Sequence, residues 1–374
     1  MGHDVGRFAA DLSAKLASHS RHVCFLLGAG SSRASGLPDV AALTGAVLTG
    51  LEGEQRDAFQ ALTAARSLEA ALSRIRRIAA LVENDDEVDG LTADRARDLD
   101  RTVCRLIVQA LIAAPVDTAA PDGFARWIER TDYSRPVEIF TINYDLLIED
   151  ALERMGVPYF DGFVGTYRAR FRTDLVEAGP KDQDLWLPNF IPRLWKLHGS
   201  ITWTWATETR TEVIRHGTAI PDQVGPAAIY PSDEKYEESR RMPFLVLQDR
   251  FRRALLEPET LTVIAGYSWG DAHLNELVFD AAQRRPRSEV LALNFGNIPE
   301  ELAQAATQIP NLQTTAPHEA IIGTVRDTWS GPVDGLPASL WSDDRFALGD
   351  FAAFSSYLAR TVPPQQVAVA DTDA

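Results

Sequence analysis

Residues 22–32 read HVCFLLGAGSS, and this stretch decides the fold. A short apolar run predicts a buried strand, and the glycines and serines after it predict a tight turn into a helix. Similar runs ending in turn residues recur at 137–142 (VEIFTI), 193–198 (RLWKLH), 261–266 (LTVIAG) and 289–294 (EVLALN). Helical periodicity separates several of them, as at 145–154 and 271–284. Strands that alternate with helices predict an α/β fold, with a parallel sheet covered on both faces.

The rest of the chain predicts how its 374 residues are organised. A long Ala-, Leu-, Arg- and Glu-rich helical pattern, broken by the acidic loop 83–90, follows the first strand and predicts a helical insertion. Residues 201–217 predict a β-hairpin, the aromatic segment 157–192 is expected to be irregular, and 344–360 predicts a helix before a disordered tail. We therefore expect an α/β domain, a helical insertion and a C-terminal region at 1–40 with 133–330, at 41–132 and at 331–374.

Composition narrows the classes of function. The formal net charge of −16 gives an acidic surface that repels phosphate backbones, so we expect no direct nucleic-acid binding. No run approaches the roughly 18 apolar residues of a membrane span, and the N-terminus reads as an amphipathic helix, so we expect a cytoplasmic protein. Cys24 and Cys104 lie in apolar runs and predict buried thiols. Two cysteines cannot build a cysteine-only zinc site, and we expect no bound metal.

Polar and glycine residues collect where the predicted strands end. They are Gly28 to Ser32 after the first strand, Asn143 to Asp145 after the second, His198 at the third, Gly266 to Ser268 at the fourth and Asn294 at the fifth. In an open α/β sheet, ligands bind at the carboxyl edge of the strands. The sequence therefore predicts a binding site at this edge.

The loop after the first strand is a candidate phosphate site. Gly28 and Gly30 can let the backbone approach an anion, and Ser32 can donate a hydrogen bond to it. The GxGxxG fingerprint of dehydrogenases would need a glycine at Arg33, and no acidic residue ends a second strand about 20 residues later. This departure argues against hydride transfer. A tight turn that binds no ligand is the alternative.

The ends of the second and third predicted strands carry polar side chains that could act on a ligand. Asn143 can hold a sugar hydroxyl or a water, because its amide both donates and accepts. Asp145 can act beside it or can cap the following helix, and the sequence leaves both interpretations open. His198 can act as a general base near neutral pH, although a structural histidine is the alternative. Asp271 is expected to cap a helix, and His273 is expected to be structural.

Taken together and in order, these motifs resemble those of the sirtuins. GAGSSRASGLPD at 28–39 resembles the sirtuin signature GAGxSxxxGIPDFR, TINYD at 141–145 resembles TQNID, and KLHGS at 196–200 resembles the catalytic His-Gly motif. Ser268 and Asn294 match the later glycine-serine and asparagine elements. The resemblance implies a Rossmann-like parallel sheet of the sirtuin type, with a helical insertion replacing the zinc module, and NAD⁺ as substrate.

Departures from the deacylase pattern refine this resemblance. Val40-Ala41 stands in place of Phe-Arg, Ile142 in place of Gln, and the four zinc cysteines are absent. The pattern is more similar to the sirtuin-like NAD⁺-hydrolysing effectors of bacterial antiphage defence. This resemblance implies an NAD⁺ glycohydrolase that releases nicotinamide and ADP-ribose and depletes NAD⁺ in abortive infection. The alternatives are a protein deacylase or ADP-ribosyl transferase, and a non-catalytic sensor of NAD⁺ or ADP-ribose.

The resemblance also implies roles and partners. Asn143, His198 and Asp145 are the expected catalytic residues. The expected cofactor-binding residues are Gly28, Ala29, Gly30, Ser32, Pro38, Asp39, Ser268 and Asn294. An unregulated NADase would harm its host, so control in trans is expected, by homo-oligomerisation or by a HerA-like ATPase partner.

Overall fold

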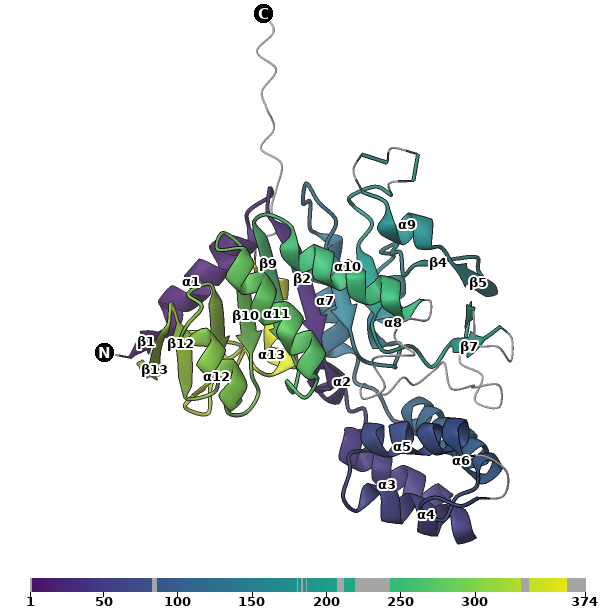
Figure 1. The fold of residues 1–374 in the computed structure, drawn as a ribbon. Helices are drawn as coiled ribbons and strands as arrows, with labels where there is room; N and C mark the ends of the chain where they lie inside the picture. The colour runs from purple at the N-terminus through teal and green to yellow at the C-terminus, as the bar shows by residue number, and fades with distance from the viewer. Residues whose placement is uncertain are drawn as a thin grey trace, which may run out of the picture.

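The structure is a computed structural model that describes residues 2–82, 86–179, 181–182, 184–185, 187–206, 212–218, 243–330 and 336–361. A nine-stranded sheet forms its centre, in the order β1-β13-β12-β11-β10-β9-β2-β3-β6 (Figure 1). These strands are β1 His3–Asp4, β2 His22–Leu27, β3 Glu138–Thr141, β6 Arg193–Lys196, β9 Thr260–Ala265, β10 Glu289–Leu293, β11 Leu312–Thr315, β12 Glu319–Ile322 and β13 Val325–Ser330. A four-stranded sheet of order β4-β5-β8-β7 and the pair β14-β15 are smaller, with β4 Phe163–Val164, β5 Arg168–Phe171, β7 Trp203–Trp205, β8 Val213–His216, β14 Trp341–Ser342 and β15 Arg345–Phe346.

The helices connect these strands and also form a separate group. They are α1 Val5–Leu16, α2 Ala29–Arg33, α3 Val40–Gly50, α4 Gly53–Thr63, α5 Leu68–Leu81, α6 Ala93–Ala113, α7 Ala119–Glu129, α8 Leu147–Arg154, α9 Thr173–Glu177, α10 Phe244–Leu256, α11 Ala272–Arg284, α12 Glu300–Ala306 and α13 Phe351–Arg360. Short polar side chains cap the first turns of α1, α3, α5, α6, α11 and α13, namely Asp4, Asp39, Ser67, Thr92, Asp271 and Asp350. Each cap satisfies a backbone N–H that the helix itself leaves without a partner.

Six neighbouring strands, from β11 to β6, run parallel. Numbered by their order in the chain, they lie side by side as 3-2-1-4-5-6, with β2 as the first strand and β9 as the fourth. This is the strand order of a Rossmann fold, whose ligand crevice opens where the order reverses. The crevice is therefore expected at the carboxyl ends of β2 and β9.

Successive side chains along a strand point to opposite faces of the sheet, and helices cover both faces. In β2, Val23, Phe25 and Leu27 enter the core that contains α1, α7, α8 and α13. Cys24 and Leu26 point to the opposite face and pack under α10, α11 and α12. Figure 1 shows α10, α11 and α12 in front of the sheet. The predicted α/β fold with a parallel sheet covered on both faces is confirmed.

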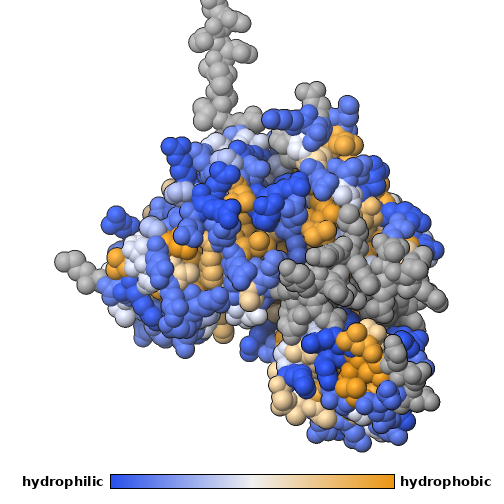
Figure 2. Space-filling model, in the orientation of Figure 1, coloured by the Kyte–Doolittle hydropathy of each residue, from blue (hydrophilic) through white to orange (hydrophobic). Residues whose placement is uncertain are grey.

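Helices α3 to α6, here called the helical bundle, have a core of their own that includes Leu43, Phe59, Leu72 and Ile107. The bundle lies beside the carboxyl edge of the sheet (Figure 1). Helix α7, although it also falls within 41–132, instead joins the core of the sheet and packs against α13. Hydrophobic side chains gather on the exposed face of the bundle in Figure 2.

Several local predictions can be compared with the structure. The five predicted strands are confirmed, and so is the hairpin, because β7 and β8 pair antiparallel; residues 207–211 between them lie outside the described residues. The expected irregular segment 157–192 contains β4, β5 and α9, which the sequence reading missed. The expected disordered tail lies outside the described residues from 362 onward. Among the described residues, no helix is long and apolar enough to span a membrane.

Candidate functional site

The carboxyl ends of β2 and β9 meet through three glycines. Gly28 N–H donates to Ala265 O at 3.0 Å, and Gly30 N–H donates to Gly266 O at 2.8 Å. A Cβ on Gly28 would lie 2.5 Å from Gly266 O, and one on Gly30 would lie 2.7 Å from Gly266 Cα. The sequence assigned Gly28 and Gly30 to the approach of a ligand. Close packing of two backbones already requires both of them.

Gly266 gives a direct test of this packing. Its φ of +65° is in the left-handed region, and an added Cβ would lie 2.3 Å from Ser31 N. We expect Gly266→Ala to lower the free energy of unfolding by at least about 1–3 kcal/mol, because strain and overlap add together. Gly296→Ala is the control, since its Cβ would meet no described atom within 4 Å. Urea unfolding of both variants measures the effect, and equal stabilities would contradict it.

Asn143 is held against residues 28–32, which follow β2 and are here called the β2 loop. Its Nδ2 donates to Gly28 O at 2.9 Å and lies 3.0 Å from Ser31 Oγ and 2.8 Å from Ser32 Oγ. Its backbone N–H donates to Thr141 Oγ1 at 3.0 Å. These hydrogen bonds fix the side chain through its nitrogen, so Oδ1 is the atom suited to accept a hydrogen bond from a ligand hydroxyl or a water.

Asp145 supports the same loops through both carboxylate oxygens. Oδ1 accepts from the N–H of Leu147, the first residue of α8, at 3.1 Å, and Oδ2 accepts from Ser32 Oγ at 2.5 Å. Behind it, buried Lys196 donates to the Asp145 carbonyl and pairs with Glu149 at 2.9 Å. Burial raises the pKa of Glu149 and outweighs the opposite effect of Lys196. These contacts give Asp145 a supporting role at the start of α8 and at Ser32, although the N-cap of α8 is Leu146.

His198 lies beside a carboxylate. Its Nε2 is 3.4 Å from Asp271 Oδ2, and both side chains are buried. Asp271 Oδ1 accepts from Leu274 N–H at 3.1 Å, so the predicted helix cap is confirmed. One oxygen of Asp271 therefore caps α11, and the other faces His198. A carboxylate at this distance can orient an imidazole and stabilise its protonated form.

These side chains open on one cavity of about 420 Å³ between the sheet edge and the helical bundle. The predicted site residues that line it are Ala29, Ser32, Pro38, Asn143, Asp145, His198 and Ser268. The structure places four other predicted residues elsewhere. Gly28 and Gly30 pack against the backbone of Gly266, and Asp39 caps α3. Asn294 donates to Thr314 Oγ1 at 2.7 Å and to Thr315 O at 2.9 Å.

Sequence reasoning missed part of this cavity. Asp271 was interpreted only as a cap, and Tyr267, which donates to Asn275 Oδ1 at 2.9 Å, was not singled out. The helical bundle adds Glu69 and an apolar wall that consists of Leu43, Leu68, Leu72, Ile107 and Leu111. Helical periodicity marks such residues as buried. It does not tell whether they face a helix or a ligand.

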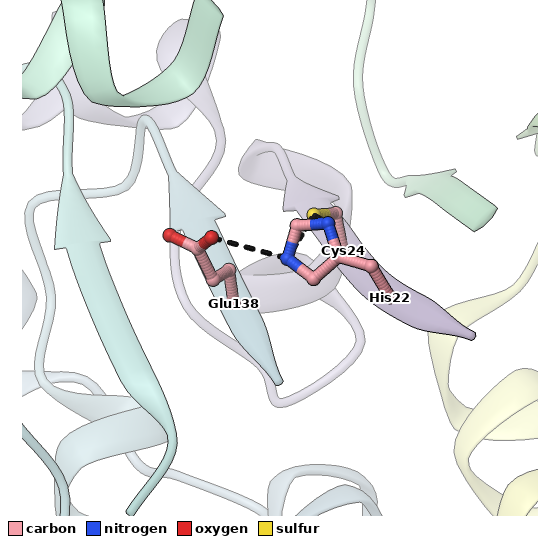
Figure 3. Close-up of side chains that lie close together, drawn as sticks. All are labelled: His22, Cys24 and Glu138. Atoms are coloured by element: carbon pink, nitrogen blue, oxygen red, sulfur yellow. Dashed lines mark hydrogen bonds and ion pairs between the residues drawn. The ribbon is translucent and has the colours of Figure 1, made fainter. Parts of the chain in front are cut away.

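A second polar cluster lies at the opposite edge of the sheet, where the strands begin. His22, Cys24 and Glu138 come together there (Figure 3). His22 Nε2 lies 3.1 Å from Glu138 Oε1, and Cys24 Sγ lies 3.6 Å from the same nitrogen. Glu138 also accepts from Arg250 through both oxygens and from Trp195 Nε1 at 2.8 Å.

These three residue types could bind a metal, but their surroundings do not fit one. A metal needs a thiolate and a carboxylate with free oxygen lone pairs. Burial and the nearby Glu138 raise the pKa of the Cys24 thiol well above its ordinary value, which disfavours the thiolate. The guanidinium of Arg250 already occupies Glu138. We interpret the cluster as a buried ion pair that joins β2, β3 and α10.

The fold and its edge define a class: an α/β protein with the Rossmann strand order and a cavity at the point where that order reverses. Residues 137–310 match the family model of the SIR2-like domain, which supports a relation to the sirtuin-like family. The match runs from β3 to α12 and includes Asn143, His198 and Asp271. No curated protein matches the chain.

Proposed function

We propose that this protein is an NAD⁺ glycohydrolase that cleaves the bond between nicotinamide and ribose. The observation that carries the proposal is the meeting of Asn143 and His198 on one cavity, next to the β2 loop. The SIR2-like match over 137–310 supports NAD⁺ as the substrate class. The altered residues Val40, Ala41 and Ile142 support hydrolysis over deacylation.

The reaction needs little acid catalysis. Water forms a bond to the ribose C1′, the C1′–nitrogen bond breaks, nicotinamide leaves as a neutral molecule, and one proton is released. The transition state resembles an oxocarbenium ion, as in glycoside hydrolysis. The protein has to hold the diphosphate, orient the ribose and present the water.

Described residues can meet these requirements. Asn143 Oδ1 would accept from the water or from a ribose hydroxyl, and His198 would take the proton. The carboxylate of Asp271 would then stabilise the imidazolium. Ser268 would donate to the diphosphate. Asp145 would act by holding Ser32 in place.

Product analysis tests the proposal. The purified chain is incubated with NAD⁺, alone and together with a HerA-like ATPase, and the products are separated by chromatography. Nicotinamide and ADP-ribose in equal amounts are expected. Nicotinamide that appears only with an acylated peptide would favour the deacylase, and NAD⁺ that binds without cleavage in either condition would favour the sensor.

We further propose that activity is controlled in trans, by self-association or by a HerA-like ATPase, as part of an antiphage response that depletes NAD⁺. Exposed apolar side chains on the helical bundle, such as Leu81 at the end of α5 and Ile112 on α6, support an interface there. A pull-down from the native operon tests the partner. Recovery of this chain alone would contradict the partner.

A further inference from the structure

The two loops that carry Asn143 and His198 both reach into the helical bundle. Tyr144, directly after Asn143, packs against the bundle core, and Ile201, three residues after His198, is part of it. Ile201 is 6% exposed. Each loop therefore carries one proposed catalytic residue on the cavity and one residue that packs in the bundle.

A hydrogen bond joins the two loops. Ile201 N–H donates to the carbonyl oxygen of Tyr144 at 3.0 Å, and Ser200 Oγ lies 3.5 Å from the same oxygen. Ile201 belongs to the His198 loop, and its hydrogen bond reaches Tyr144, the residue next to Asn143. A shift of Ile201 therefore acts on both loops.

The side chains around Tyr144 point in two directions. Asn143 and Asp145 face the β2 loop, through Gly28 and Ser32. The side chain of Tyr144 packs against the bundle core instead, and burial raises the pKa of its hydroxyl, with a further rise from Glu69 and an opposing effect from Arg76. Arg76 itself belongs to a buried ion pair between α5 and α6, with Nε 2.9 Å from Asp100.

We propose that Tyr144 and Ile201 are positioning residues through which the helical bundle sets the geometry of Asn143 and His198. Both anchors belong to loops whose catalytic side chains must be placed within a fraction of an ångström. The inference rests on the proposed hydrolysis of NAD⁺. It adds that the bundle takes part in assembling the site, beyond covering the cavity.

Ile201 gives the sharper test, because Tyr144 lines the cavity and Ile201 does not. We expect Ile201→Ala to lower kcat for NAD⁺ on the order of 10- to 100-fold, with a much smaller change in KM. Ile201→Val should restore most of the rate, because it keeps a branched side chain. Leu62→Ala on α4 is the matched control: it truncates the same core at a residue 2% exposed, outside the cavity and outside both loops.

Hydrogen exchange gives a readout that does not depend on catalysis. In the full-length protein, Ile201→Ala should speed amide exchange in peptides that cover 143–147 and 198–201, while Leu62→Ala should leave these peptides unchanged. If both variants lose kcat equally and neither alters exchange in these peptides, the proposal is overturned. If the wild-type chain releases no nicotinamide, either alone or with the HerA-like ATPase, the proposed function fails, and the exchange comparison still decides whether the bundle holds the loops.

Discussion

Replacing His198 with alanine is expected to lower the rate of nicotinamide release on the order of 10²–10⁴-fold, the usual contribution of a positioned general base. Asn143→Ala should have an effect of similar size, since it removes both the acceptor Oδ1 and the three contacts of Nδ2 with the β2 loop. Steady-state rates of NAD⁺ cleavage measure both effects. Circular dichroism checks that the variants remain folded.

Asp271→Asn separates the two tasks of Asp271. Asparagine caps helices as well as aspartate does, so α11 should be retained, while the charge that faces His198 is lost. We expect a lower kcat with little change in melting temperature. His318→Ala, at an exposed histidine outside the cavity, is the control and should keep the wild-type rate. Full activity of His198→Ala would rule out the proposed base.

The largest effect on stability is expected at the amino edge of the sheet. Glu138 is fully buried and pairs with Arg250, which donates to both of its oxygens. Glu138→Gln leaves the guanidinium of Arg250 without its counter-charge. Breaking a buried ion pair from one side costs about 3–5 kcal/mol. That is a large part of the roughly 5–15 kcal/mol by which folded proteins are stable.

The same carboxylate makes this contribution pH-dependent. Burial alone would raise the pKa of Glu138, but Arg250 and His22 outweigh burial and hold this pKa far below its ordinary value of 4.5. On acidification the unfolded state therefore takes up the proton first. The contribution of Glu138 is complete above about pH 4.5 and is lost as the pH falls further.

Urea unfolding as a function of pH checks both statements. The difference between wild type and Glu138→Gln should be largest near neutral pH and should shrink in acid. Glu319→Gln, which breaks the exposed pair with Arg326 on β13, is the control and should cost less than about 1 kcal/mol. A Glu138→Gln variant as stable as this control would show that the buried pair contributes little.

Much of the site could be predicted because it depends on strand ends. Asn143 and His198 follow β3 and β6, which are parallel neighbours, so their carboxyl ends had to meet. The same reasoning placed Ser268 at the cavity. It failed to bring Asn294 there, although that residue also ends a strand, because β10 lies one strand beyond β9 and Asn294 bonds to the end of β11.

Other features depended on contacts between distant segments. The reason for Gly28 and Gly30 became clear only once Gly266 was placed against them. The carboxylate beside His198 comes from a helix cap 73 positions later in the chain, a role that spacing alone could not assign. The partners of His22 are contributed by β3 and β9, which pair with β2 from either side.

By itself, the sequence determined the α/β fold, the five parallel strands that it marked and the edge at which polar groups gather. Periodicity and turn residues are local properties of the sequence. Because parallel strands run in one direction, the residues that follow them gather at one edge of the sheet. The tertiary structure alone decided that the helical bundle closes the cavity, that Asp271 faces His198, and that Tyr144 and Ile201 anchor both loops in the bundle. These features arise from packing between segments far apart in the chain, and local patterns show that a residue is buried without showing against what.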